Sequence, residues 1–123
     1  MKNPDGTKTP YFLHAEDEGL LAAAGLYELW PDPDLAEDDP KKWLWTATIA
    51  TTFATDALGH IHDRTPVFIA PDRYDQWLDN HLQDATEVDE LLRSLPEPVL
   101  QATEVGPAVG AVRNDGPGLI SAV

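Results

Sequence analysis

The chain has 123 residues, of which 42% are hydrophobic, and a formal net charge of -14 at pH 7. It contains no cysteine, which excludes disulfides, thiolate catalysis by the chain as given, and zinc sites of the finger type. The acidic charge argues against strong nonspecific binding of the whole chain to nucleic acid, because Lys and Arg hold a phosphate backbone. With no apolar run of about 18 residues and no secretory signal, we expect a single soluble, cytoplasmic domain without a membrane partner.

The first third of the chain predicts two strands and a loop. Residues 11–14 and 20–30 are expected to form a hairpin around the acidic turn at residues 16–19. Residues 31–42 are rich in proline and acidic side chains and lack periodicity, so they predict an acidic surface loop.

The middle of the chain contains the clearest strand. Residues 43–52 alternate two sets of side chains and are rich in aromatic and β-branched types, as expected of a strand. Residues 56–58 are interpreted as a short helical turn. Residues 65–69 predict a further strand, with Pro66 at its start, where a missing donor costs little.

The last part of the chain predicts helices followed by strands. Pro71 suits a first helical position, so residues 71–80 are expected to be helical, and a second helix is expected to begin at Thr86 as its cap and to end before Pro96. Residues 99–105 and 109–113 predict strands, and residues 114–118 predict a turn. The sum is an α+β fold with mostly antiparallel strands in a barrel-like mixed sheet and two or three short helices.

Imidazole, carboxylate and guanidinium groups are gathered just after the strand at residues 43–52. His62 can exchange a proton near neutral pH, Asp63 can orient its ring, and Arg64 offers donors suited to phosphate. His60 and His62 are two apart and would project to the same side of an extended segment, which suits two metal ligands. The residues alone leave acid–base and metal chemistry open.

Five segments together resemble one known family. They are residues 10–12, 24–30, 46–52, 61–67 (Ile-His-Asp-Arg-Thr-Pro-Val) and 112–114. Their order and spacing are similar to those of the SOS response-associated peptidase (SRAP) family over nearly the whole chain. The Ile-His-Asp-Arg-x-Pro core is the most specific of these elements.

This resemblance implies a function in sensing abasic sites in single-stranded DNA. In such proteins an N-terminal cysteine, exposed by removal of the initiator Met, forms a thiazolidine with the ring-opened sugar, and the family also has autopeptidase activity. The resemblance makes His62 the catalytic histidine, Arg64 a DNA-contacting arginine and Thr51 a pocket-lining, DNA-binding threonine. It implies no cofactor and no metal.

Three elements of the family are missing from the sequence: the cysteine motif, an Asn-x-Arg element and the catalytic Glu motif. Glu28 lies after residues 10–12 and matches a second, similar element, so we interpret it as a strand residue. We therefore expect residues 1–123 to be a partial, C-terminal SRAP-like domain that is inactive alone.

Two alternatives remain at this point. The first is a noncatalytic module that pairs with a separate N-terminal half or with itself as a homo-oligomer. The second is a small metal-dependent hydrolase that uses His60, His62 and Asp63.

Overall fold

A computed structural model of the chain describes residues 1–54 and 60–123. These residues form an α+β fold in two compact units. The first unit consists of residues 1–21, 52–65 and 96–123, and the second of residues 22–51 and 66–95. The turn expected at residues 56–58 lies outside the described residues. Within the described part of the chain, no helix is long and apolar enough to cross a membrane.

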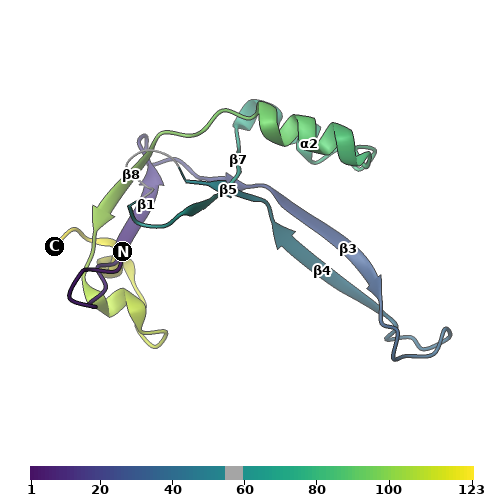
Figure 1. The fold of residues 1–123 in the computed structure, drawn as a ribbon, viewed down its shortest axis with the longest axis horizontal. Helices are drawn as coiled ribbons and strands as arrows, with labels where there is room; N and C mark the ends of the chain where they lie inside the picture. The colour runs from purple at the N-terminus through teal and green to yellow at the C-terminus, as the bar shows by residue number, and fades with distance from the viewer. Residues whose placement is uncertain (55–59) are drawn as a thin grey trace. The chain divides into compact units, whose positions relative to one another are not determined.

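The first unit is built around the strand pair of β1 (Tyr11–Ala15) and β8 (Leu100–Glu104), labelled in Figure 1. The two strands are antiparallel, with Tyr11 opposite Glu104 and Ala15 opposite Leu100. Two short 3-10 helices follow, η3 (Pro107–Gly110) and η4 (Pro117–Ile120). An isolated bridge from Ala122 to Val105 then returns the tail to the end of β8.

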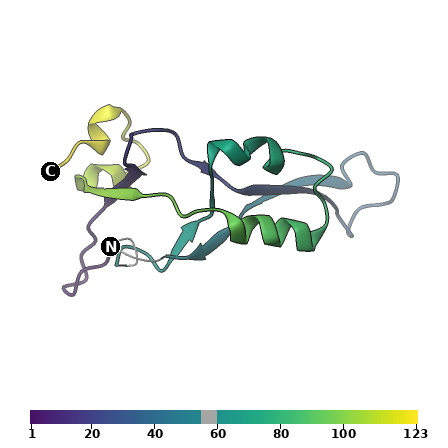
Figure 2. The same ribbon diagram turned by 90° about the horizontal axis from the view of Figure 1, so that it is seen from above.

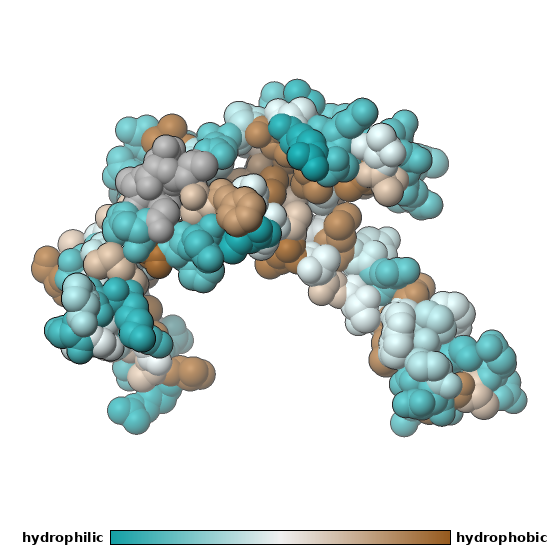
Figure 3. All heavy atoms as spheres, viewed as in Figure 1, coloured by the Kyte–Doolittle hydropathy of each residue, from teal (hydrophilic) through white to brown (hydrophobic). Residues whose placement is uncertain are grey.

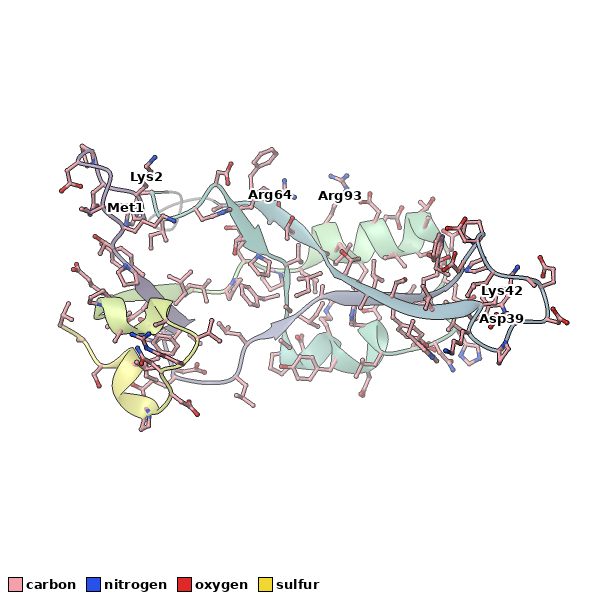
Figure 4. The ribbon with its side chains drawn as sticks, turned by 90° about the horizontal axis from the view of Figure 1, so that it is seen from below. Met1, Lys2, Asp39, Lys42, Arg64 and Arg93 are labelled. Atoms are coloured by element: carbon pink, nitrogen blue, oxygen red, sulfur yellow. The ribbon has the colours of Figure 1, made fainter. Side chains whose placement is uncertain are left out.

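The second unit contains the longest strand pair, which we call the β3–β4 hairpin. Strands β3 (Gly25–Pro31) and β4 (Trp43–Ile49) run side by side in opposite directions (Figure 1), with Gly25 opposite Ile49 and Pro31 opposite Trp43. The connecting residues 32–42 are folded into successive turns, and the Asp32 N–H donates to the Lys42 carbonyl at 2.7 Å. Asp39 and Lys42 lie together in this tip loop (Figure 4), where buried Lys42 pairs with Glu37 at 3.0 Å.

Three predicted strands break at one junction in the second unit. Ala24 separates β2 (Ala22–Ala23) from β3, Ala50 ends β4, and Val67 precedes β7 (Phe68–Ile69). Their backbones bond in a cycle: Ala24 N–H to the Val67 carbonyl at 2.8 Å, Val67 N–H to Ala50 at 2.9 Å, and Ala50 N–H to Ala24 at 2.9 Å. Ala24 is fully buried, so its small side chain lets three backbones meet there. The cycle explains why the strands are shorter than predicted.

The helices of the second unit are short, and both are visible in Figure 2. The 3-10 helix η2 (Pro71–Arg73) leads into α1 (Tyr74–Trp77), which stops earlier than the predicted helix over residues 71–80. Helix α2 (Ala85–Ser94) begins one residue before the predicted cap. Asp84 is the true cap, because its carboxylate accepts from the N–H groups of Thr86 at 3.0 Å and Glu87 at 3.1 Å.

Two further predictions about the strands are wrong. Strand β1 does not form a hairpin with residues 20–30, since its partner is β8, while β2 pairs with β7 and β3 with β4. Residues 109–113 do not form a strand; Pro107 begins the 3-10 helix η3 there, and its ring suits a first helical position. Long-range pairing and local proline geometry outweigh the apolar pattern in these two cases.

The strands of the described residues form four two-stranded sheets: β1–β8, β2–β7, β3–β4 and β5–β6. The three pairs with a resolved register are antiparallel. No closed barrel is found among these residues, so the predicted barrel-like arrangement is not confirmed. The buried apolar side chains of the described residues are few: Ala24, Ile69, Leu91 and Val105.

Candidate active site

The predicted site follows β5 (Thr51–Phe53) and leads into β6 (Arg64–Pro66), and the two strands pair with each other. The Ala54 N–H donates to the Asp63 carbonyl at 2.9 Å, which extends this pairing beyond the strands. His62 therefore lies in the turn directly before β6. The first unit, which contains residues 52–65, thus carries both His62 and Arg64.

Nδ1 of His62 faces three polar atoms. The backbone N–H of Arg64 lies 3.0 Å from it, the Arg64 carbonyl oxygen 3.1 Å, and Oδ1 of Asp63 3.2 Å. A single nitrogen cannot accept from the N–H and donate to an oxygen at once, so these contacts support two states of the ring. With Nδ1 accepting, the neutral ring carries its single proton on Nε2; with Nδ1 protonated and donating, Nε2 has a lone pair and is a base in the neutral ring, or carries a second proton and is an acid in the imidazolium.

The environment of His62 leaves its outer nitrogen within reach of a substrate. The side chain of His62 is 69% exposed and that of Asp63 is 86% exposed. The Asp63 carboxylate lies 3.2 Å from Nδ1, where it can accept a hydrogen bond from a protonated Nδ1. The arrangement can therefore deliver a proton to an external atom and take one back.

Arg64 lies on the first position of β6 (Figure 4). Its guanidinium carbon is 5.1 Å from the centre of the Phe53 ring, so the two side chains form a cation–π pair across the β5–β6 strands. Phe53 is 72% exposed. The pair holds a positive group beside His62 in a chain whose net charge is strongly negative.

His60 and Asp63, the other two proposed metal ligands, do not complete a metal site with His62. His60 contacts the edge of the Tyr11 ring, with ring centres 6.2 Å apart and an interplanar angle of 84°. Among residues 1–54 and 60–123, no group of three His, Asp or Glu side chains is placed to hold a metal ion. The alternative that uses His60, His62 and Asp63 as ligands therefore has no geometric support.

Thr51 is the third residue that the sequence predicts for the site. It is the first residue of β5, is exposed, and belongs to the second unit. The structure thus brings together His62 and Arg64 of the three predicted residues. The role of Thr51 remains a prediction.

Comparisons with known proteins show which family the chain belongs to. The family model of the SOS response associated peptidase (SRAP) matches residues 2–112. The chain is 33% identical to the abasic site processing protein YoqW of Bacillus subtilis over 93% of its length. It belongs to the SRAP family. It is also 30% identical to the abasic site processing protein HMCES of Gallus gallus, over 91% of this chain and 37% of that protein.

The chain spans about half the length of the curated relatives it matches, including 48% of YoqW. A crystal structure of a protein from Bacteroides thetaiotaomicron shares the fold, with a TM-score of 0.71 and 21% identity. That match covers 99% of this chain and 51% of the other. YoqW and the Bacteroides protein thus each contain about as much sequence again outside the matched region.

Two residues near the site were not predicted from the sequence. Phe53 is an ordinary strand residue by pattern, and Tyr11 lies more than 40 positions from His60. The pairing of β5 with β6 brings Phe53 to Arg64, and no local spacing signals it.

Proposed function

We propose that this SRAP chain contributes the proton-transfer part of an active site that processes abasic sites in single-stranded DNA. Its relatives are named abasic site processing proteins, and the His62–Asp63–Arg64 arrangement is the observation that carries the proposal. The chain would act in the cytoplasm, as part of a larger SRAP fold in which the four small sheets join into a more continuous, barrel-like sheet.

His62 is the proposed catalytic acid and base. An abasic sugar exists mainly as a closed ring, and a proton delivered to the ring oxygen helps it open to an aldehyde. The doubly protonated imidazole, with its Nδ1–H beside the Asp63 carboxylate, delivers the Nε2 proton to the oxygen of the sugar ring; the C1–O bond of the sugar ring breaks as the C1 hydroxyl releases its proton to water. The same group then accepts a proton in the reverse reaction.

Arg64 and Thr51 are the proposed DNA contacts. A guanidinium group binds a phosphate oxygen pair through parallel donors, and Arg64 is two residues from His62 at the start of β6. Single-stranded DNA is the expected form, because its backbone and unstacked bases are open to such contacts. The threonine hydroxyl would add a polar contact at the pocket wall.

The nucleophile must come from outside this sequence. Thiazolidine formation needs an amine that condenses with the aldehyde and releases water, and a thiol that adds to the resulting imine carbon. The chain has no cysteine, so as given it should not crosslink DNA. We propose that it corresponds to the C-terminal part of an SRAP protein and that the cysteine and glutamate belong to the other part.

The test is a crosslinking assay with the cysteine-bearing part of YoqW added to this chain and an abasic single-stranded oligonucleotide. A denaturing gel should show a shifted DNA band only when both polypeptides are present. His62→Gln should slow the shift by about 100-fold or more. His81→Gln is the matched control, since His81 is also exposed and has its Nδ1 3.0 Å from the carboxylate of Asp79.

Three results would decide against this proposal. A shift with this chain alone would overturn the account of the nucleophile. A shift that His62→Gln leaves unchanged would remove the catalytic role of His62. Complex formation without any shift would favour the noncatalytic module.

A further inference from the structure

The two faces of the β3–β4 hairpin differ in chemistry. Residues directly opposite in the antiparallel register point to the same side, and successive residues alternate. One side, which we call the apolar face, carries Tyr27, Leu29, Trp43, Trp45 and Ile49 with Gly25, Pro31 and Ala47. The other side carries Glu28, Thr46 and Thr48 at its centre and Leu26, Trp30 and Leu44 toward its ends, where each of these three is less than half exposed. The hairpin strands thus present a face without a single charged residue.

The apolar face is open to solvent along its length. Trp45 is 74% exposed and Tyr27 72%, and the two rings contact each other with centres 5.5 Å apart. Trp43 and Ile49 are each 56% exposed. Contiguous apolar surface of this kind marks an interaction site in a stable protein. Scattered exposed residues would need no explanation, but here five large side chains share one face.

The exposed area of the chain agrees with a large missing contact. The accessible surface is 9551 Å² for a mass of 13.5 kDa. Two separate compact proteins of half that mass would together expose roughly 7,900 Å². The excess of about 1,700 Å² is twice the roughly 800 Å² that each partner contributes to a standard interface.

The charges of the tip loop and of the whole chain disfavour two candidate occupants of the apolar face, nucleic acid and a second copy of the chain. The tip loop carries five acidic and two basic residues, and the apolar face has no Lys or Arg to hold phosphate. Nucleic acid is therefore disfavoured. Two copies of the chain would each bring a charge of -14, so self-association is opposed as well. In Figure 3 the hydrophilic teal surface of the hairpin gathers toward this tip, which suits a basic partner.

We propose that the apolar face is the docking surface for a polypeptide that is apolar at its centre and basic at its margin. The occupant is the part of the SRAP fold that relatives such as YoqW have outside the matched region, in the same polypeptide or in a separate one. This inference rests on the proposed function, since it assigns to one face the contact that brings in the nucleophile.

Co-expression tests the docking surface without DNA. The tagged chain is produced together with the part of YoqW outside the match, and the amount that co-purifies is measured. Trp45→Lys should lower it at least tenfold and Trp45→Ala severalfold, because both remove a large aromatic contact. Thr46→Lys, one position along β4 and on the other side, should leave it within twofold. Circular dichroism confirms that each variant keeps the wild-type fold.

Several outcomes would overturn this assignment. These are absence of the YoqW part from the purified wild-type chain, equal losses for Thr46→Lys and Trp45→Lys, and a dimer of the chain alone that Trp45→Lys dissociates. Loss of oligonucleotide binding in Trp45→Lys without its partner would assign the face to DNA. If Trp45→Lys abolishes complex formation but the wild-type complex does not crosslink DNA, the docking surface is supported and the proposed function is wrong. If the complex crosslinks DNA and Trp45→Lys does not affect it, the proposed function is supported and the docking surface is wrong.

Discussion

The β3–β4 hairpin and the β5–β6 strand pair are neighbours in sequence but are stabilised in different ways. The hairpin has two strands of seven residues in continuous register, yet the large side chains of its apolar face are exposed. The β5–β6 pair has three residues in each strand; next to it, Nδ1 of His62 contacts the Arg64 backbone and the Asp63 carboxylate, and the Phe53 ring contacts the Arg64 guanidinium. The longest regular strand pair and the closely contacting polar groups therefore lie in different places: the contacts of His62 are local, whereas the large side chains of the apolar face remain exposed.

The largest expected effect separates chemistry from assembly. When the cysteine-bearing part of YoqW is saturating, His62→Gln should still crosslink abasic DNA about 100-fold more slowly, because the proton donor is lost. Trp45→Lys should recover close to the wild-type rate under the same conditions, since it weakens only docking. Rates measured over a range of partner concentrations distinguish the two. A Trp45→Lys chain that stays slow at saturation would show that the hairpin itself takes part in the reaction.

A second prediction compares the hairpin with the small core. Leu91 on α2 is 5% exposed, and Leu91→Ala should lower the free energy of unfolding by about 2–5 kcal/mol, the usual cost of a cavity. Leu29 on the apolar face is 42% exposed, so Leu29→Ala should cost less than about 1 kcal/mol in the chain alone. Urea unfolding followed by circular dichroism measures both. Equal costs would mean that the apolar face is already covered.

The same contrast explains what the sequence could predict. Period-two alternation predicted β4, the start and stop residues Thr86 and Pro96 predicted α2, and the Ile-His-Asp-Arg motif indicated the family, which the family model confirms. The roles of the site residues stay predictions. These signals are local, and the local structure follows them. The predicted site residues His62 and Arg64 lie together because they are separated by one residue.

The wrong strand partner and the shortened strands have a common physical cause, which is pairing between distant segments. Nothing near Tyr11 signals that its partner is Glu104, and nothing near Ala24 signals that its backbone bonds to Ala50 and Val67. The predicted N-cap of α2, Thr86, was wrong for another reason. Thr86 and Asp84 are each good caps, and the choice depends on which backbone N–H groups remain unpaired at the helix start.

A third prediction concerns the Phe53–Arg64 pair. A cation–π contact at an exposed site contributes about 0.5–1 kcal/mol. A double-mutant cycle with Phe53→Leu and Arg64→Gln should show a coupling free energy of this size in urea unfolding. Trp45→Leu with Arg64→Gln is the control, since Trp45 is equally exposed and lies in the hairpin. Coupling indistinguishable from the control would remove Phe53 from the account of the site.

The smallest expected effect concerns the polar turn at Asp79–His81 and the pKa of its carboxylate. The turn at Asp79–His81 resembles the one at His62–Asp63, since each places Nδ1 beside a carboxylate. The backbone N–H of His81 donates to Asp79 at 2.9 Å, and this bond, followed by the side-chain bond from His81, lowers the pKa of Asp79. The lowered pKa means that ionised Asp79 favours the folded state. Its contribution is present above the ordinary carboxyl pKa and is lost as the pH falls through the lowered value.

The order of those two causes predicts how replacing His81 changes the pKa of Asp79. His81→Ala keeps the backbone donor, so the pKa of Asp79 should rise only part of the way to its ordinary value. Asp5 gives the opposite case, because the Thr7 hydroxyl is the largest cause of its lowered pKa, and Thr7→Val should return most of the shift. Carboxyl NMR titrations of the two variants measure both values. If His81→Ala restored the ordinary pKa fully, the turn would depend on its side chain, and the site turn at His62 would then be expected to depend on Asp63 in the same way.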